Sequence, residues 1–269
     1  MTPSKLLTNP QSTCILISRL DSDELRQQQA IYKKWLDKDE VTRLNQIRPE
    51  KDKLRFITGR AIIKSVIAEL MQVSPESVSL HIDRFGKPLL NTNSNLSFNI
   101  SHSGNYIVAI FTEGFTSGID IQSRDLNTGF EDIMKQSFSE QEIDNLKLDS
   151  SSVNDRFYNS WTIKEAFAKA HGIGMHMNFK KLEVLYKENT QQQANLHAFD
   201  LNIPFPFISG QCQWMIKSFQ MINAIMSIAI NHRDQKIPEL HFYNFIPEST
   251  LTPIEPAPYG IGKSVMKPL

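Results

Sequence analysis

Hydrophobic residues recur with the period of an α-helix in three parts of the chain. A pattern at 21–36 begins with Asp21, Ser22 and Asp23 as possible caps, and another at 155–170 stops at Gly172. The strongest pattern covers 52–71, and its apolar positions are Leu54, Ile57, Ile62, Ile63, Val66, Ile67 and Leu70. These patterns predict three helices. Arg55, Arg60 and Lys64 lie among the apolar positions as candidate solvent or ligand contacts.

The period changes from 3.6 to 2 after the second helix. We expect strands at 78–83, 96–100, 106–111, 118–121, 182–186, 212–219 and 222–230, with a turn at 85–88. The sequence Ser139 to Glu142 is a capping-box signature that predicts a further helix start. This order of elements predicts an α+β fold of two similar halves, 1–118 and 119–233, although no clear sequence repeat relates them. Residues 234–269 contain several prolines and no sustained period, so we treat them as an extension of uncertain order.

Charge and cysteine content exclude several classes of protein. The chain has 29 Lys and Arg against 29 Asp and Glu, unlike a dedicated nucleic-acid binder. Cys14 and Cys212 are too few for a disulfide framework or a four-cysteine zinc site, and they favour a reducing compartment. Residues 1–20 lack a signal-peptide pattern, and the apolar run 224–230 is too short to span a bilayer. We expect a soluble cytoplasmic protein with no nucleic-acid or membrane partner.

Two polar residues in the strand at 118–121 and just after it have the spacing of a metal half-site. Strand alternation places Asp120 and Gln122 on one face and Ile119 and Ile121 on the other. Magnesium prefers a few protein oxygens together with water and substrate phosphates. The pair therefore indicates a candidate magnesium site, with a solvated strand end as the alternative.

The helix at 155–170 carries a second group of polar residues. Trp161, Lys164, Glu165 and Lys169 share a face beside its apolar stripe. An ordinary surface ion pair between Glu165 and Lys169, worth about 0.3–0.5 kcal/mol, would explain part of this pattern equally well.

The sequence Phe98 to Gly104 joins two apolar strands and contains Ser101, His102 and Ser103. A Ser/His hydrolase is disfavoured, because adjacent side chains on an extended chain point apart and the Gly-x-Ser-x-Gly elbow is missing. Hydroxyl, imidazole and backbone N–H groups can all donate to phosphate oxygens. Phosphate binding is therefore the better interpretation, with a polar hairpin turn as the alternative.

Five short sequences in order resemble the signatures of the Sfp-type 4'-phosphopantetheinyl transferases. They are Phe85-Gly86-Lys87-Pro88, Phe98-Asn99-Ile100-Ser101-His102-Ser103, Gly118-Ile119-Asp120-Ile121, Phe138-Ser139-Glu140-Gln141-Glu142 and Trp161-Thr162-Ile163-Lys164-Glu165-Ala166. The resemblance implies two similar α/β halves related by a pseudo-twofold axis, with coenzyme A in the cleft between them and the metal site at their junction. It also implies a holo-[acyl-carrier-protein] synthase type of enzyme that moves phosphopantetheine from coenzyme A to a serine of an apo-acyl or peptidyl carrier protein. The second product would be adenosine 3',5'-bisphosphate.

The same resemblance implies roles for individual residues. Asp120 and Glu165 would bind Mg2+, with Gln122 as a further oxygen ligand, and Glu165 or a water that it holds would be the base. Catalysis would thus rest on Asp120, Glu165 and Lys169. Coenzyme A would be bound by Arg43, Arg55, Lys87, Pro88, Ser101, His102, Lys164 and Lys169, with His102 near the 3'-phosphate. Glu142 matches a family glutamate near the carrier surface, but the capping box explains it better.

Gln122 departs from the family pattern, because many members carry a second carboxylate at this position. An amide oxygen can bind magnesium but brings no negative charge, so the metal affinity is open. The sequence therefore also permits a non-catalytic coenzyme A or carrier-protein binding module, or a metal-dependent phosphoesterase that uses Asp120 and Glu165. By resemblance we expect a monomer; the sequence does not identify the carrier protein or its pathway.

Overall fold

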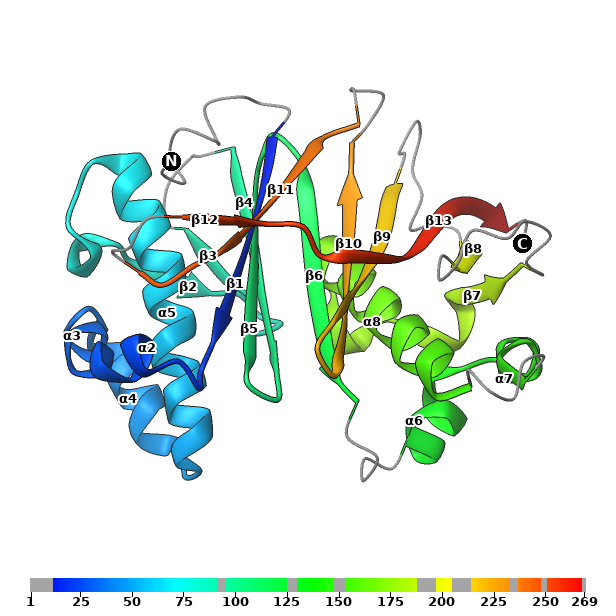
Figure 1. Cartoon of the computed structure of the whole chain (residues 1–269), viewed down its shortest axis with the longest axis horizontal. Helices are drawn as coiled ribbons and strands as arrows, with labels where there is room; N and C mark the ends of the chain where they lie inside the picture. The colour runs from blue at the N-terminus through cyan, green and yellow to red at the C-terminus, as the bar shows by residue number, and fades with distance from the viewer. Residues whose placement is uncertain are drawn as a thin grey trace. The chain divides into compact units, whose positions relative to one another are not determined.

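The chain divides into two compact units, each of which combines helices with a β-sheet. The computed structural model describes residues 12–90, 95–124, 130–147, 153–187, 197–204, 214–232, 237–247 and 251–267 (Figure 1). Unit 1 comprises Met1–Gly114 and Pro238–Glu255, and unit 2 comprises Phe115–Ile237 and Pro256–Leu269. The predicted α+β class is confirmed in both units.

Unit 1 is built on a five-stranded sheet with the strand order β12-β11-β1-β5-β4. Its strands are β1 (Ser12–Arg19), β4 (Leu96–Ser103), β5 (Tyr106–Glu113), β11 (Glu239–Asn244) and β12 (Thr252–Ile254), and a separate hairpin contains β2 (Leu80–Ile82) and β3 (Pro88–Leu90). β11 pairs with β1 in parallel, and the other neighbours are antiparallel. Part of the segment whose order the sequence left uncertain is thus paired with the first strand of this sheet.

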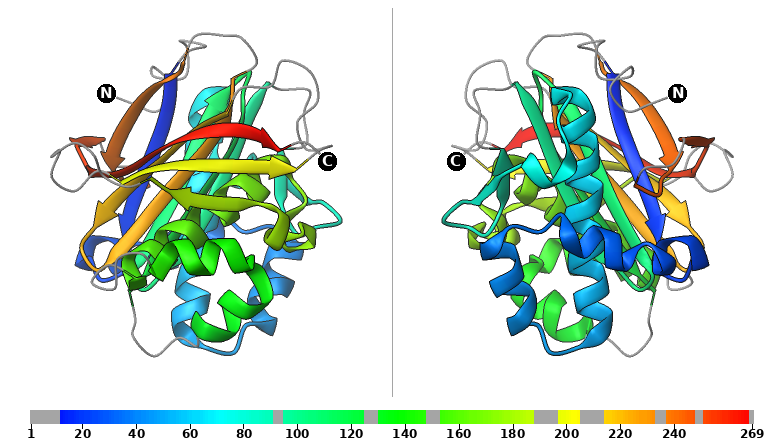
Figure 2. Two further views of the ribbon diagram at one scale, coloured as in Figure 1. Left: turned by 90° about the vertical axis from the view of Figure 1, so that its right-hand side faces the viewer. Right: turned by 90° about the vertical axis from the view of Figure 1, so that its left-hand side faces the viewer.

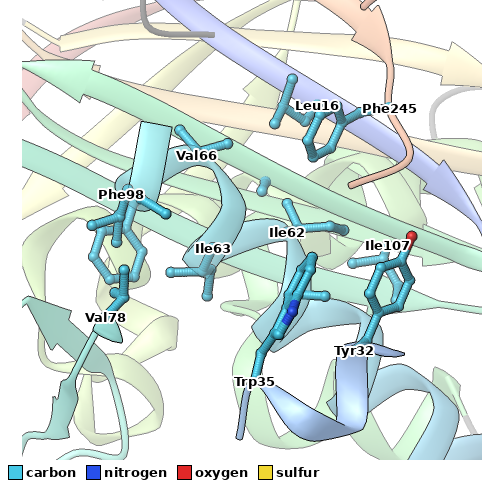
Figure 3. Close-up of a cluster of buried hydrophobic side chains, with 14 of the residues drawn as sticks. Leu16, Tyr32, Trp35, Ile62, Ile63, Val66, Val78, Phe98, Ile107 and Phe245 are labelled. Atoms are coloured by element: carbon cyan, nitrogen blue, oxygen red, sulfur yellow. The ribbon is translucent and has the colours of Figure 1, made fainter. Parts of the chain in front are cut away.

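The helices of unit 1 are α2 (Asp23–Gln27), α3 (Gln29–Lys34), α4 (Lys38–Gln46) and α5 (Glu50–Met71), with a short 3-10 helix at Pro75–Ser77. The pattern at 21–36, which predicts one helix, corresponds to two, α2 and α3, which meet at Gln28. α5 occupies the range of the strongest helical pattern. Its apolar residues Ile62, Ile63 and Val66 are fully buried among Leu16, Phe98 and Ile107 of the sheet (Figure 3).

Unit 2 has a six-stranded sheet with the order β6-β10-β9-β13-β8-β7. Its strands are β6 (Thr116–Ser123), β7 (Glu183–Tyr186), β8 (His197–Pro204), β9 (Trp214–Met221), β10 (Ala224–Asn231) and β13 (Ala257–Lys267). The helices are α6 (Phe130–Ser137), α7 (Glu140–Lys147) and α8 (Val153–His171), and 3-10 helices lie at Gly174–His176 and Phe179–Lys181. β13, also from the end of the chain, runs between β9 and β8.

The two units repeat the same central plan. In unit 1 the antiparallel strands β1, β5 and β4 are neighbours, and α5 packs on them. In unit 2 the strands β6, β10 and β9 are arranged in the same way, and α8 packs against β6 and β10 (Figures 1 and 2). Among the described residues, no helix has the combination of length and apolar character needed to cross a membrane.

Gly118 of β6 lets α8 approach the sheet more closely than any residue with a side chain would. A Cβ atom at this position would lie 2.5 Å from the backbone nitrogen of Ala170, and closer still to the carbonyl oxygen of Ala166. Both atoms belong to the helix backbone, so they cannot move without shifting α8. The sequence Gly118-Ile119-Asp120 therefore places a packing requirement two residues before a carboxylate of the candidate site.

We predict that Gly118→Ala lowers the free energy of unfolding by about 1–3 kcal/mol, the usual cost of overpacking. Gly59→Ala is the matched control, because its new Cβ would meet only the end of the Ile100 side chain at 3.1 Å and alanine favours the helix. Denaturant unfolding of both variants makes the comparison. A Gly118→Ala variant as stable as the parent would show that α8 does not need this close approach.

Candidate functional site

Asp120 and Lys169 form the centre of the candidate site in unit 2. Asp120 lies on β6 and is buried, with only 2% of the residue exposed. Lys169 Nζ from α8 lies 2.6 Å from Asp120 Oδ1, with a quarter of the lysine side chain exposed. The ion pair thus joins the helix to the strand close to Gly118, where the two backbones approach each other. Lys169 also shares a helix face with Glu165.

Glu165 is the second carboxylate of this site. It precedes Lys169 by one helical turn on α8 and is 9% exposed. Burial, and after it the negative charge of Asp120, raise the pKa of Glu165 to about 7, while Lys169 opposes the shift. Two carboxylates that repel each other in a buried place are stabilised by a cation, so the electrostatics of the site favour metal binding.

Gln122 lies beside Asp120, as strand alternation predicted. Its Nε2 donates a hydrogen bond to Asp120 Oδ2 at 3.2 Å. Within the described part of the chain, no cluster of three or more His, Cys, Asp or Glu residues could hold a metal. A metal here would therefore have two carboxylates and one amide oxygen available. This oxygen-only donor set fits Mg2+, which retains water and phosphate ligands.

Lys164 does not belong to the exposed part of this site. Its side chain is fully buried, and Nζ donates to Ser137 O at 2.9 Å, Glu142 Oε2 at 2.6 Å and Phe179 O at 2.9 Å. An ammonium group has three donors, so these contacts leave none for a cofactor phosphate. The expected contact between Lys164 and coenzyme A is therefore corrected: this lysine holds α8 in place from the inside.

Glu142 is part of the same buried arrangement. Its Oε2 accepts from the backbone N–H of Ser139 at 2.9 Å, and Ser139 Oγ accepts from the N–H of Glu142 at 3.2 Å. This confirms the predicted capping box. Glu142 is fully buried, and its Oε1 accepts from Val184 N at 2.8 Å. The alternative position near a carrier-protein surface does not fit this burial.

Unit 1 contains a separate pocket with a volume of about 450 Å3. It is lined by Arg43, Ile47, Asp52, Arg55, Phe56, Gly59, Arg60, Gly86, Pro88, Ile100 and His102. The three arginines and the histidine that line this pocket favour an anionic ligand. Guanidinium groups in particular match the geometry of phosphate. Four of the predicted cofactor contacts, Arg43, Arg55, Pro88 and His102, thus lie in one pocket.

Local hydrogen bonds fix the shape of this pocket. Arg55 donates to Asp52 Oδ1 at 2.6 Å and to the carbonyl oxygen of Gly104 at 2.7 Å, which links α5 to the turn after β4. In the turn before β3, Asp83 Oδ1 accepts from the backbone N–H groups of Phe85 and Lys87, both at 2.8 Å. Gly86 adopts φ +85° there, a conformation that favours glycine.

Two predicted cofactor contacts of unit 1, Ser101 and Lys87, are not among the residues that line the pocket. Ser101 is buried, and β-strand alternation places it on the opposite face of β4 from His102 and Ile100. Lys87 is half-buried next to two lining residues, and burial lowers its pKa while Asp83 opposes the shift. Their roles in binding stay predictions.

Arg60 is a pocket residue for which the sequence analysis predicts no definite role. It follows Arg55 on α5, and its guanidinium lies over the ring of Phe56 at 5.0 Å from the centroid. The helical pattern presented it only as one of three cations among apolar positions. Its spacing from Phe56, one helical turn, was the available signal.

Two family models match the chain. The model of the 4'-phosphopantetheinyl transferase superfamily matches residues 117–221, and the model described as 4'-phosphopantetheinyl transferase, N-terminal, matches residues 24–113. The first range contains the carboxylate site of unit 2, and the second contains the pocket residues of unit 1.

Individual proteins with these activities in their names are also similar. The L-aminoadipate-semialdehyde dehydrogenase-phosphopantetheinyl transferase of Rattus norvegicus is 32% identical over 54% of this chain and 51% of its own. The 4'-phosphopantetheinyl transferase ffp of Bacillus subtilis is 30% identical over 55% of this chain and 65% of its own. The chain thus spans between half and two thirds of the length of these curated relatives. The crystal structure of Thermotoga maritima holo-[acyl-carrier-protein] synthase matches with 19% identity and a TM-score of 0.35, over 43% of this chain and 62% of that chain.

We predict that Gln122→Glu tightens the binding of a divalent cation by at least about threefold, because it adds a negative oxygen beside Asp120. Titration with Mn2+, followed by electron paramagnetic resonance, measures the affinity without any turnover. Gln122→Ala is the control, with an affinity no tighter than that of the parent. Equal affinities in all three proteins would place the side chain of residue 122 outside the coordination sphere.

Proposed function

Because this chain belongs to the 4'-phosphopantetheinyl transferase superfamily, we propose that it transfers the phosphopantetheine arm of coenzyme A to a serine of an apo-carrier protein. The observation that carries this proposal is the grouping of Asp120, Glu165 and Lys169 where α8 meets β6. The grouping supplies two carboxylates for a magnesium ion and one ammonium group for a phosphate.

In the proposed reaction, the serine hydroxyl of the carrier attacks the phosphorus atom nearest the pantetheine. The bond from this phosphorus to the oxygen that bridges the pyrophosphate breaks, and adenosine 3',5'-bisphosphate leaves with that oxygen. Glu165, or a water that it holds, accepts the proton of the serine. Magnesium, when bound, neutralises charge on the pyrophosphate and on the leaving group.

Lys169 has two tasks in this proposal. In the structure it neutralises Asp120 through the 2.6 Å contact. Its partly exposed ammonium group can also donate to a pyrophosphate oxygen, and a charge-assisted hydrogen bond of this kind is stronger than a neutral one. Asp120 would then interact with both the metal and Lys169.

We propose that the pocket of unit 1 binds the phosphorylated nucleotide end of coenzyme A. Arg43, Arg55 and His102 offer donors to phosphate, and the turn at Gly86 and Pro88 forms part of the wall. Binding energy from this distant part of the substrate can be used to hold the reacting phosphate in place.

Acyl and peptidyl carriers of fatty-acid, polyketide, nonribosomal-peptide or amino-acid pathways all present a serine that could accept the arm. We further propose a cytoplasmic location, supported by the low cysteine content.

A panel of apo-carrier proteins tests the function directly. Each carrier is incubated with the protein, coenzyme A and Mg2+ and is then weighed by mass spectrometry. A gain of one phosphopantetheine on at least one carrier supports the transferase. Binding of coenzyme A without a gain on any carrier would indicate a binding module, and cleavage of coenzyme A without carrier modification would indicate a phosphoesterase.

We predict that Glu165→Gln reduces transfer by at least about a thousandfold, because the change removes a metal charge and the proposed base together. Circular dichroism and thermal unfolding provide the control that the variant still folds. A folded variant with turnover within a few-fold of the parent would remove Glu165 from both roles.

A further inference from the structure

Unit 1 contains a buried lysine on α5, Lys64, that contacts a backbone carbonyl and a glutamate; we call this set of contacts a lysine clamp. Lys64 has no exposed side chain, and its Nζ donates to the carbonyl oxygen of Trp35 at 2.8 Å and lies 2.7 Å from Glu40 Oε2. Glu40 also completes a capping box at the start of α4: its Oε2 accepts from Asp37 N at 3.0 Å, and Asp37 Oδ1 accepts from Glu40 N at 2.9 Å.

The same arrangement is present in unit 2. Lys164 of α8 contacts the carbonyl oxygen of Ser137 and the carboxylate of Glu142, which completes the capping box of Ser139. In both units the carbonyl belongs to the residue two positions before the cap, and the glutamate lies three positions after it. Lys64 and Lys164 are therefore equivalent positions of the two long helices, although the sequence shows no clear repeat.

This equivalence reveals what unit 1 lacks. If Lys64 matches Lys164, then Ser65 takes the place of Glu165 and Glu69 the place of Lys169. Ala109 and Ser227 lie equally far along the chain after the hairpin turns of β4–β5 and β9–β10. Leu16 pairs with Ala109 and Asp120 pairs with Ser227, so the apolar Leu16 of β1 takes the place of Asp120. Unit 1 thus keeps the clamp without the carboxylate site.

The free oxygen of the clamp glutamate has a different contact in each unit. In unit 2, Glu142 Oε1 accepts from a backbone N–H of β7. In unit 1, Glu40 Oε1 lies 3.0 Å from Nε of Arg60, one of the residues that line the pocket. The contact is an ion pair rather than an aligned hydrogen bond. Only 13% of the Arg60 side chain is exposed and 7% of the Glu40 side chain.

We propose that Glu40 is a positioning residue for the pocket of unit 1. Glu40 holds Arg60 at the pocket wall, where Arg60 is an additional phosphate-binding cation. Lys64 holds Glu40 through its other carboxylate oxygen, and the ring of Phe56 packs against the guanidinium of Arg60. An arginine that is already held in place loses less side-chain entropy when it binds a phosphate. The identity of the ligand rests on the proposed function, so the test must separate the two.

Two effects of Glu40 on phosphate binding have opposite signs. Its negative charge weakens the attraction of the pocket for an anion, whereas its contact with Arg60 orients a donor. Removing the charge without changing the shape, as in Glu40→Gln, should tighten binding if charge alone matters. It should weaken binding if orientation dominates, so the direction of the change distinguishes the two.

The experiment measures binding of adenosine 3',5'-bisphosphate by isothermal titration calorimetry, without carrier protein. We expect Glu40→Gln to weaken binding by about tenfold, because one charge-assisted contact is lost. Arg60→Met should weaken it at least as much, and Glu40→Gln should cause no further loss in the Arg60→Met background. Glu142→Gln is the matched control: it disturbs the equivalent clamp of unit 2, away from the pocket of unit 1, and should weaken binding clearly less than Glu40→Gln does.

Thermal unfolding of the same variants separates positioning from general destabilisation. Both glutamine variants should unfold at a lower temperature, because each weakens a buried ion pair. Unchanged or tighter binding in Glu40→Gln, or equal losses in Glu40→Gln and Glu142→Gln, would overturn the proposal. If Glu40→Gln does not fold, an Arg60→Met variant with parental affinity would overturn it as well. A parent protein that does not bind this nucleotide would instead contradict the proposed function.

Discussion

The close packing of α8 against β6 is the constraint on which the candidate site depends. Asp120 belongs to the strand, whereas Glu165 and Lys169 belong to the helix, and the contact of 2.6 Å between Asp120 and Lys169 requires the two backbones to be near each other. Gly118 permits this approach because any Cβ would collide with the helix backbone. The distance between the site residues is therefore set by a residue that carries no chemistry of its own.

Buried charge holds each long helix in its place. A fully buried ion pair gives little net stability, because its desolvation cost offsets much of the attraction, but removing one partner is costly. Lys64 and Lys164 are buried charges of this kind, and each is paired with a glutamate and at least one backbone carbonyl. The clamps thus specify position more than stability. Position is what a helix needs when it carries Glu165 in one unit and Arg60 in the other.

Local patterns in the sequence predicted local structure well and long-range contacts poorly. Alternation placed Gln122 beside Asp120, and the capping box at Ser139 formed as expected, because neighbouring residues decide both features. The burial of Lys164 depends on Ser137 and Phe179, which the helical period of α8 cannot reveal. For the same reason, the pairing of β1 with β11, more than 220 residues later, and the pocket contacts of Arg60 required the folded chain.

The central claim is that one divalent cation binds between the strand and the helix of unit 2. Anomalous diffraction from crystals grown with Mn2+ and coenzyme A, measured at the manganese absorption edge, tests it most directly. We expect a manganese peak within coordination distance of the carboxylates of Asp120 and Glu165. A manganese ion bound elsewhere, with none at Asp120 or Glu165, would contradict this account of the site.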